Sequence, residues 1–236
     1  MTLTSDAQQS LDLGPYLEPG TFVDSDHPDV RAFAGRTTAG APDDVQRAVR
    51  LYYAVRDGVL YDAYCVGETP GYYRASDCLR AGRGFCVPKA ALLAAGARVV
   101  GIPARVSYAD VRNHLATKKL LELLGTDLFV WHGLTELYLD GRWVKATPAF
   151  NLSLCERFGV HPLEFDGRHD SLFHEYDRAG RRHMEYVADR GHYADVPFET
   201  MLADFRRVYP RWVELSGRGP RRDFAREAEA ERGGGA

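Results

Sequence analysis

The side chain best placed for covalent chemistry in this sequence is a cysteine at the start of a well-formed helix. Cys86 follows the glycine-rich run "AGRGF" and precedes "VPKAALLAAGARV", an alanine- and leucine-rich stretch that ends before Gly101. Pro88 falls in the first helical turn, where a missing N–H costs nothing, so we predict a helix over residues 86–99. A helix N-terminus lowers the pKa of a thiol and offers free N–H groups to an oxyanion. Cys86 is therefore a candidate nucleophile, although buried cysteines more often serve as small hydrophobes.

A histidine further along the chain supplies the base that such a nucleophile needs. The segment "DLFVWHGLTELYLDGRWVKATPAF" contains two alternating runs joined by the dipeptide "DG", which predicts a β-hairpin. Counting back from this turn pairs Leu134 with Thr147 and His132 with Ala149, so the imidazole and the threonine hydroxyl share one face. A thiol activated by an imidazole that a third polar group orients is the general arrangement for nucleophilic catalysis.

The elements around these residues predict an α+β fold. Residues 1–40 show little periodicity and are interpreted as an extended lead-in, whereas residues 41–59 start with acidic residues and repeat apolar ones at helical spacing. Residues 60–84 are predicted to form loops or short strands, with one helical turn at "SDCLRAG". The segment "IPARVSYADV" is predicted to be a strand, and "RNHLATKKLLELLG" a loop that leads into a short helix. Helices followed by an antiparallel sheet are typical of the α+β class.

The rest of the chain carries weaker signals. From residue 152 the sequence is polar, and we expect surface loops and short elements that wrap back over the sheet. The length of 236 residues and the hydrophobic content of 45% favour one domain over residues 1–220. Residues 221–236 are charged and then glycine-rich, so we expect a disordered tail there.

Composition excludes several classes of function. The net charge of -3 arises from 30 basic and 33 acidic residues without long blocks, so nucleic acid is not an expected partner. The N-terminus lacks a leader pattern and no apolar run is long enough to cross a bilayer, so we expect a cytoplasmic protein without membrane contact. The four cysteines form no C-x-x-C pair, and the later histidines lack H-E-x-x-H spacing. We therefore expect no disulfide framework, metal or other cofactor.

Three motifs that follow one another along residues 45–151 resemble the transglutaminase-like core of the papain-like superfamily. They are "GRGFCVPKAALLAAGARVVGIPARV", "WHGLTELYLDGRW" and the "TP" that begins four residues after Trp143. The resemblance implies an α+β core in which N-terminal helices pack on an antiparallel sheet. It also implies a cysteine nucleophile at a helix start and a histidine on a later strand, positions that Cys86 and His132 occupy here.

The third catalytic position departs from the family pattern. The family's aspartate falls on Thr147, whose hydroxyl can accept a hydrogen bond from an imidazole but cannot offset the charge of an imidazolium. We therefore expect a carboxylate from elsewhere, and Asp110 in "SYADV" is the first choice, although an ordinary strand-end aspartate would produce the same pattern. The lesser alternatives are Asn151 and Asp127 for this role and His114 for the base.

The order Cys, Asp, His also resembles the Dieckmann cyclases that close tetramate and pyridone rings. That resemblance implies an acyl group passed from a carrier-protein thioester to the cysteine, followed by attack of a carbanion of the same acyl chain. The expected activity is thus acyl transfer through acyl-Cys86 from a small-molecule or carrier-bound substrate. Peptidase, amidase or amide-exchange activity is the alternative within this class. A binding module that lost catalysis together with the aspartate is the alternative from another class.

Overall fold

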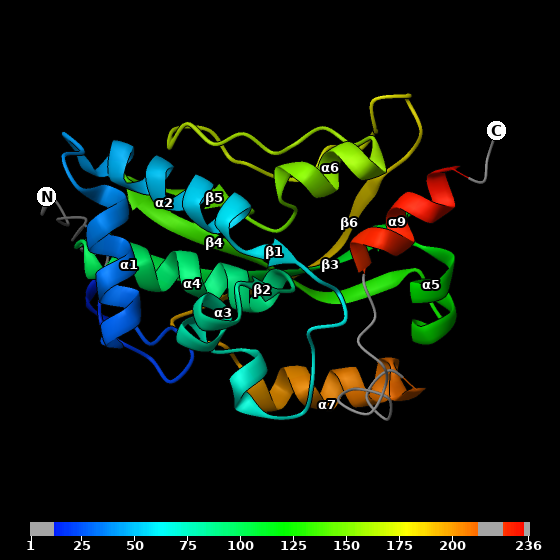
Figure 1. Ribbon diagram of the computed structural model, residues 1–236. Coiled ribbons are helices and arrows are strands. Elements are labelled where there is room, and N and C mark those ends of the chain that lie inside the picture. The colour runs from blue at the N-terminus through cyan, green and yellow to red at the C-terminus, as the bar shows by residue number, and fades with distance from the viewer. Residues whose placement is uncertain (1–11, 212–223, 234–236) are drawn as a thin grey trace, which may run out of the picture.

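A four-stranded antiparallel sheet organises the chain, with its strands in the order β5-β4-β3-β6 (Figure 1). The strands are β3 (Ala104–Asn113), β4 (Leu128–Leu139), β5 (Arg142–Ala146) and β6 (Met184–Tyr193). Two short segments, β1 (Leu60–Tyr61) and β2 (Arg83–Gly84), form a separate parallel pair. The computed structural model describes residues 12–211 and 224–233.

Helices before the sheet in sequence pack on it as a layer. They are α1 (Pro28–Thr38), α2 (Asp44–Gly58), α3 (Ala75–Ala81) and α4 (Cys86–Val99). The later helices are α5 (Lys118–Leu124), α6 (Leu152–Phe158), α7 (Phe198–Val208) and α9 (Phe224–Gly233), and η1 (Gly14–Tyr16) and η2 (Pro70–Tyr72) are single 3₁₀ turns. Helix α4 contacts β3 and β4, while α1, α2 and α3 pack on α4. This architecture confirms the predicted α+β fold.

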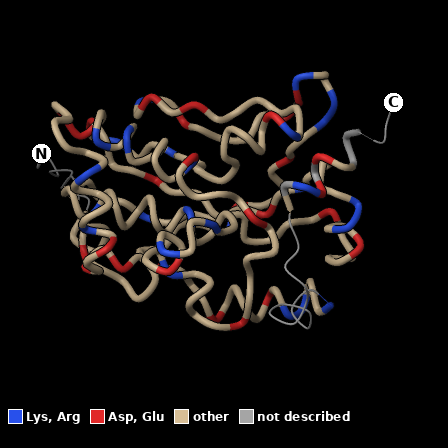
Figure 2. Tube along the Cα trace, viewed as in Figure 1, with Lys and Arg blue, Asp and Glu red and all other residues tan. Residues whose placement is uncertain are grey.

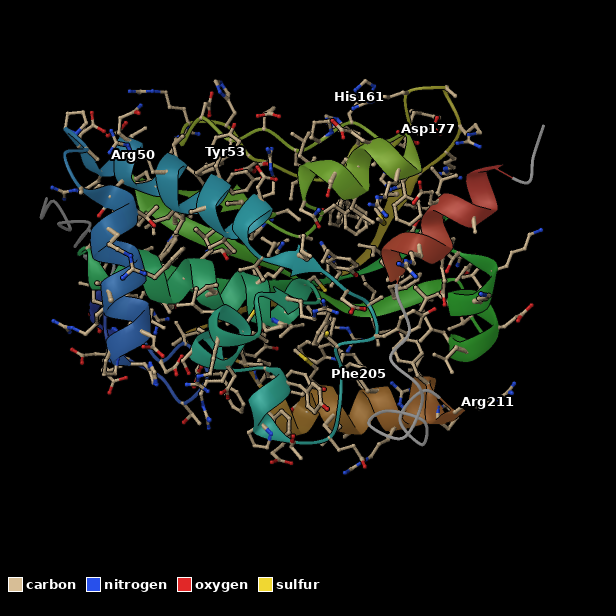
Figure 3. The ribbon with its side chains drawn as sticks, in the orientation of Figure 1. Arg50, Tyr53, His161, Asp177, Phe205 and Arg211 are labelled. Atoms are coloured by element: carbon tan, nitrogen blue, oxygen red, sulfur yellow. The ribbon has the colours of Figure 1, made fainter. Side chains whose placement is uncertain are left out.

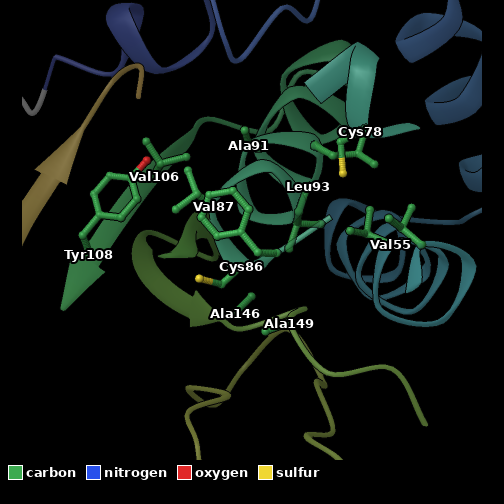
Figure 4. Packing of buried hydrophobic residues seen from close by; sticks show 14 of the residues in the cluster. Val55, Cys78, Cys86, Val87, Ala91, Leu93, Val106, Tyr108, Ala146 and Ala149 are labelled. Atoms are coloured by element: carbon green, nitrogen blue, oxygen red, sulfur yellow. The ribbon is translucent and has the colours of Figure 1, made fainter. Parts of the chain in front are cut away.

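Helix α4 is the centre of the molecule and is buried along nearly its whole length. Its small residues allow close packing, and Figure 4 shows Val87 and Ala91 on this helix next to Val106 and Tyr108 of β3. Lys89 is also completely buried. Its ammonium group donates hydrogen bonds to the carbonyl oxygens of Arg56 and Val59, which lie at the C-terminal end of α2. Burial lowers the pKa of Lys89 to about 7.

The hairpin forms as predicted at its turn but ends earlier than the counting implied. Strand β5 pairs with β4 from Arg142 to Ala146, which lies opposite Thr135. Beyond Ala146 the chain leaves the sheet, so the expected pairings of Thr147 and Ala149 with β4 do not form. The edge of β4 from Leu134 back to its start is consequently not covered by β5.

The N-terminal forty residues and the segment after residue 152 contain more regular structure than expected. Within the supposed extended lead-in, α1 begins at Pro28, and the side chain of His27 caps it by accepting a hydrogen bond from the Asp29 N–H. Strand β6 is a fourth strand of the sheet and pairs with β3, and α7 follows it. Most β6 residues are partly or fully exposed, which explains why their polar sequence gave no strand signal.

The expected disordered tail is also corrected in part. Residues 224–233 form α9, and Phe224 at its start is buried. Figure 1 shows α9 beside α6, in agreement with the contacts between these helices. Residues 221–223 and 234–236 of that tail lie outside the described residues.

Charges of both signs are mixed over the molecule rather than gathered into one block (Figure 2). Among the described residues, no helix combines the length and the apolar character needed to cross a membrane.

Candidate functional site

Cys86 is the first residue of α4, as predicted from the sequence. Pro88 has no N–H, and the Lys89 N–H is hydrogen-bonded to the Phe85 carbonyl oxygen, so the N–H groups of Cys86 and Val87 are the donors left at this helix end. The side chain is almost fully buried, with 8% of the residue surface exposed. Burial raises the pKa of the Cys86 thiol to about 11, although N–H groups of Gly133, Val87 and Cys86 act in the opposite direction. The expected lowering by the helix end is therefore outweighed by desolvation.

Strand β4 approaches the N-terminus of α4 unusually closely at Gly133. A Cβ atom at this position would lie 3.0 Å from the Cα atom of Val87 and 3.3 Å from the carbonyl oxygen of Cys86. Only glycine permits this approach without displacement of the strand or the helix. Because His132 directly precedes Gly133, the contact fixes where the histidine backbone lies relative to the thiol.

His132 is buried on β4 and lines the same cavity as Cys86. Its ring lies 5.0 Å from that of Phe173 and 6.5 Å from that of Tyr186, centroid to centroid. The Nε2 atom has no hydrogen-bond partner among the described residues, and burial lowers the pKa of His132 to about 4. No direct hydrogen bond joins the imidazole to Cys86. Such contacts are often long in unliganded sites and shorten when substrate binds.

Thr147, which occupies the family's aspartate position, is buried, and its hydroxyl also lacks a hydrogen bond of ordinary length. The hydroxyl lies close enough to that of Tyr186 to oppose slightly the effect of burial, which raises the pKa of Tyr186 to about 12. The Tyr186 hydroxyl accepts a hydrogen bond of 3.3 Å from the Phe173 N–H. His132 Nε2 and Thr147 Oγ1 are thus two buried polar atoms without hydrogen-bond partners among the described residues.

Asp110 does not supply the carboxylate that we expected to orient His132. Its two oxygens accept hydrogen bonds from Arg190 at 2.6 and 2.8 Å, and one of them also accepts the Trp131 N–H at 3.1 Å. Arg190 donates further to Asp204 at 2.6 Å and lies over the Trp131 ring at 4.8 Å. Asp204 also accepts the Trp131 indole N–H at 2.9 Å. Every polar group of this cluster is therefore engaged with a neighbour other than His132.

The cluster surrounds a strained residue that directly precedes His132. Trp131 has φ +61°, in the left-handed region that non-glycine residues rarely adopt. The pairing of β3 with β4 shifts here, between Ala109, which is opposite His132, and Val111, which is opposite Phe129. Such a bulge re-aims the next side chain along the strand. Asp110 and Asp204 accept hydrogen bonds from the backbone and indole N–H groups of Trp131, and Arg190 joins these two carboxylates.

The lesser alternatives have other partners. Asn151 accepts a hydrogen bond from the Tyr61 N–H and donates one to Ser153, while Asp127 pairs with Arg112. The His114 ring lies 3.3 Å from a Glu185 oxygen. His183, one of the histidines in the polar segment after residue 152, is buried, and burial lowers its pKa to about 4.

The cavity at Cys86 and His132, here called the Cys86 cavity, is lined mainly by aromatic and aliphatic side chains. Five elements beyond the sheet contribute to it, among them α7 through Phe205, which Figure 3 labels on that helix. Its lining consists of Tyr61, Ala63, Phe85, Cys86, Val111, Asn113, Leu120, Leu124, Phe129, Val130, Trp131, His132, Phe150, Phe173, Met184, Phe205, Tyr209 and Phe224.

Sequence reasoning missed most of these lining residues. Phe173 and Met184 lie in the polar region after residue 152, and Phe224 lies in the supposed tail. The available signal was a few apolar residues without periodicity in each otherwise polar segment, which is too weak to assign to a site. Among the described residues, no group of three or more His, Cys, Asp or Glu side chains is arranged to hold a metal ion.

Comparison with protein families matches residues 31–148, half of the chain, to the transglutaminase-like superfamily. The chain therefore belongs to the transglutaminase-like superfamily, as the cysteine and histidine motifs indicated. Membership supports a cysteine-dependent enzyme. No curated protein sequence matches the chain.

Two solved structures are similar to this chain. One is described as a candidate cysteine protease from Cytophaga hutchinsonii, with 18% sequence identity, a TM-score of 0.49 and coverage of 80% of this chain. The other is described as a candidate protease from Parabacteroides distasonis, with 17% identity, a TM-score of 0.38 and coverage of 60% of this chain. The matches span 49% and 26% of those two proteins, respectively.

Proposed function

We propose that the chain transfers acyl groups from thioesters through an acyl-Cys86 intermediate, with His132 as the general base and acid. The observation that supports the proposal is the shared cavity, which the Cys86 thiol at the N-terminus of α4 and the His132 imidazole line together with mainly apolar side chains. Gly133 supports it by bringing β4 against the first turn of α4. The N–H groups of Cys86 and Val87 are the donors available to an oxyanion.

The missing carboxylate on His132 favours a thioester donor over an amide. An amine must be protonated before it leaves, which requires an imidazolium as acid, whereas a thiolate leaves without that help. Burial without a partner keeps the pKa of His132 at about 4, so an imidazolium is costly in this site. The neutral imidazole accepts the Cys86 proton as the C–S bond forms, and the imidazolium exists only until the departing thiolate takes that proton.

The first half-reaction moves the acyl group from the donor thiol to Cys86. His132 takes the proton of the Cys86 thiol, the sulfur attacks the thioester carbonyl, and the donor thiolate departs and takes that proton back. We propose ring closure of the Dieckmann type as the second half-reaction. His132 removes an acidic C–H proton of the bound acyl chain, the carbanion attacks the acyl carbon, and the bond to Cys86 breaks. The returning proton restores the thiol.

An internal carbanion is favoured as acceptor because the cavity is small and mostly apolar, so little water can compete for the acyl-enzyme. A donor held by a carrier protein fits a buried cysteine, since a long thiol arm can enter where a folded protein cannot. Hydrolysis and amide exchange are the competing outcomes of the same acyl-enzyme.

The test is intact-protein mass spectrometry after incubation with simple acyl thioesters and, separately, with peptides and primary amides. We expect an acyl adduct from thioesters that maps to Cys86, and no adduct from amides. The Cys86→Ala variant should form none, and His132→Gln should acylate at least about a thousandfold more slowly. A folded wild-type protein that is never acylated would instead support a catalytically silent binding module.

A further inference from the structure

We propose that the Cys86 cavity holds the apolar part of the acyl group, that it selects against charge there, and that Phe224 limits the length of that part. This inference rests on the proposed function for its chemistry. It concerns which acyl groups bind rather than whether Cys86 reacts.

Among the described lining residues, the polar side-chain groups without a hydrogen bond are the reacting pair, the Tyr61 hydroxyl and the Asn113 amide nitrogen. Asp, Glu, Lys and Arg are absent from the described lining residues. The Tyr209 hydroxyl is used by the Val130 N–H and the Leu128 carbonyl oxygen, and the Trp131 indole N–H by Asp204. The Asn113 side-chain oxygen accepts the Leu115 N–H.

This mainly apolar lining determines which substrates gain free energy when they enter the cavity. A peptide would lose the hydration of its amide groups without new partners, and a charged group would be buried without a counterion, so both are disfavoured. An aliphatic chain gains about 0.8 kcal/mol for each methylene that it buries, which corresponds to about fourfold in affinity. The cavity is thus suited to the apolar part of an acyl chain.

The size of the cavity points to a short chain while α9 is in place. The unfilled volume is about 60 Å³, well below the roughly 150 Å³ of an engineered protein cavity that admits benzene. Phe224 is the lining residue that α9 contributes, and it is 4% exposed. Its ring packs against those of Tyr61 and Phe158, with centroids 5.7 Å away in both cases. Removing this ring would lengthen the space open to substrate.

Helix α9 is attached by more than Phe224. The Tyr64 hydroxyl donates a hydrogen bond of 2.5 Å to Glu227, and Arg157 of α6 pairs with Glu229 at 3.3 Å. The loss of the Phe224 ring can therefore be tested with the helix still anchored by its polar contacts.

The experiment measures the rate of Cys86 acylation by N-acetylcysteamine thioesters, using intact mass. The acyl groups are acetyl, butyryl, octanoyl and an octanoyl analogue that ends in a carboxylate. We expect butyryl to react about tenfold faster than acetyl, and the carboxylate analogue to react at least about 100-fold more slowly than octanoyl. Equal rates for the charged and the apolar chain would overturn the proposal.

Variants test the role of Phe224. Phe224→Ala should raise the rate of octanoyl relative to butyryl by about tenfold. The matched control is Phe158→Ala, which removes the partner ring but does not line the cavity, and it should leave the ratio unchanged. Met184→Ala enlarges the cavity from β6 and should shift the ratio in the same direction even if Phe224→Ala does not fold. An unchanged ratio in both folded lining variants would overturn the length limit.

Calorimetric titration of the Cys86→Ala variant separates this proposal from the proposed function. The ligand is the octanoyl thioester, and the protein is the double variant Phe224→Ala/Cys86→Ala. Binding of this thioester with a negative heat-capacity change, without binding of the analogue that ends in a carboxylate, supports the apolar cavity even if the wild type never acylates. Acylation of the wild type without discrimination between the two chains would leave the proposed function standing and reject the apolar selectivity.

Discussion

Two neighbouring residues of β4, Trp131 and His132, have opposite environments. Trp131 is strained at φ +61°, yet both of its N–H groups are bonded and an arginine covers its ring. His132 has a buried Nε2 atom that bonds to nothing in the described part of the chain. The charged groups in this region therefore bond to the residue before His132, and the buried imidazole has no charged partner at Nε2.

This division fits the proposed roles of Cys86 and His132 in a chain that has Thr147 at the position of the family's aspartate. A carboxylate on the imidazole would both orient the ring and stabilise its charged form. Here orientation comes from the backbone, through the bulge at Trp131 and the close approach at Gly133. Stabilisation of the charge is absent, which matches a donor whose leaving group needs no strong acid.

The largest expected effect follows from breaking the cluster of Asp110, Arg190 and Asp204 around Trp131. Arg190→Met removes the cation from Asp110 and Asp204, leaving two carboxylates without their common partner. We expect a loss of about 3 kcal/mol in the free energy of unfolding and a fall of about 10- to 100-fold in Cys86 acylation as the bulge relaxes. Denaturant titration and intact-mass kinetics provide the two measurements.

A second ion pair on β3 provides the control for Arg190→Met. Arg105 pairs with Glu136 and lies 4.0 Å over the Trp143 ring, so Arg105→Met removes a comparable buried arginine outside the Cys86 cavity. It should destabilise the fold similarly but change acylation by less than about twofold. The His132 ring signals in NMR spectra should shift in Arg190→Met and stay in place in Arg105→Met. Equal acylation losses in both variants would mean that the cluster is only structural.

The buried imidazole of His132 predicts a loss of stability in acid. Burial lowers the pKa of His132 from 6.5 to about 4, so below pH 6.5 the unfolded chain binds a proton that the folded chain refuses. The stability that goes with the neutral imidazole is fully present above pH 6.5 and is lost as the pH falls to about 4, amounting to about 3 kcal/mol. His132→Gln should flatten this part of the curve of unfolding free energy against pH.

His183 gives an independent check on that assignment. Its pKa is also lowered to about 4 by burial, so His183→Gln should flatten the same pH range separately, and the double variant should show the sum. A stability curve that His132→Gln leaves unchanged between pH 6.5 and about 4 would show that the imidazole is not buried in its neutral form.

The smallest expected change comes from giving His132 the partner that it lacks. Thr147→Asp places a carboxylate at the family position and should raise the pKa of His132 toward its ordinary range, which NMR titration of the ring protons measures. We expect thioester acylation to change by less than about tenfold, because the leaving thiolate needs little acid. An unaltered histidine titration would place Thr147 away from the imidazole.

Much of the core could be predicted from local sequence signals. Pro88 and the alanine-rich run define α4 with the bounds observed, and the Asp140-Gly141 turn gives the register of β4 and β5 as far as Ala146. These signals are strong because capping and turn chemistry depend on residues close together in the chain. The family likewise followed from motifs that keep their spacing.

What the sequence did not reveal depends on contacts between distant segments. The partner of Asp110 is Arg190, eighty positions away on a strand whose exposed residues gave no strand pattern. The pKa of the Cys86 thiol could not be predicted, because it depends on burial, whose effect outweighs that of the helix N-terminus. Phe224 looked like part of a charged tail because a single aromatic residue does not reveal which surface it packs against.

The most direct test of the central claim, a neutral thiol beside a neutral imidazole, is the rate of Cys86 alkylation by iodoacetamide as a function of pH, measured by peptide mass. We expect the rate to climb about tenfold per pH unit through neutrality toward the thiol pKa of about 11. A plateau that begins below about pH 6 would reveal a thiolate–imidazolium pair and would contradict the account.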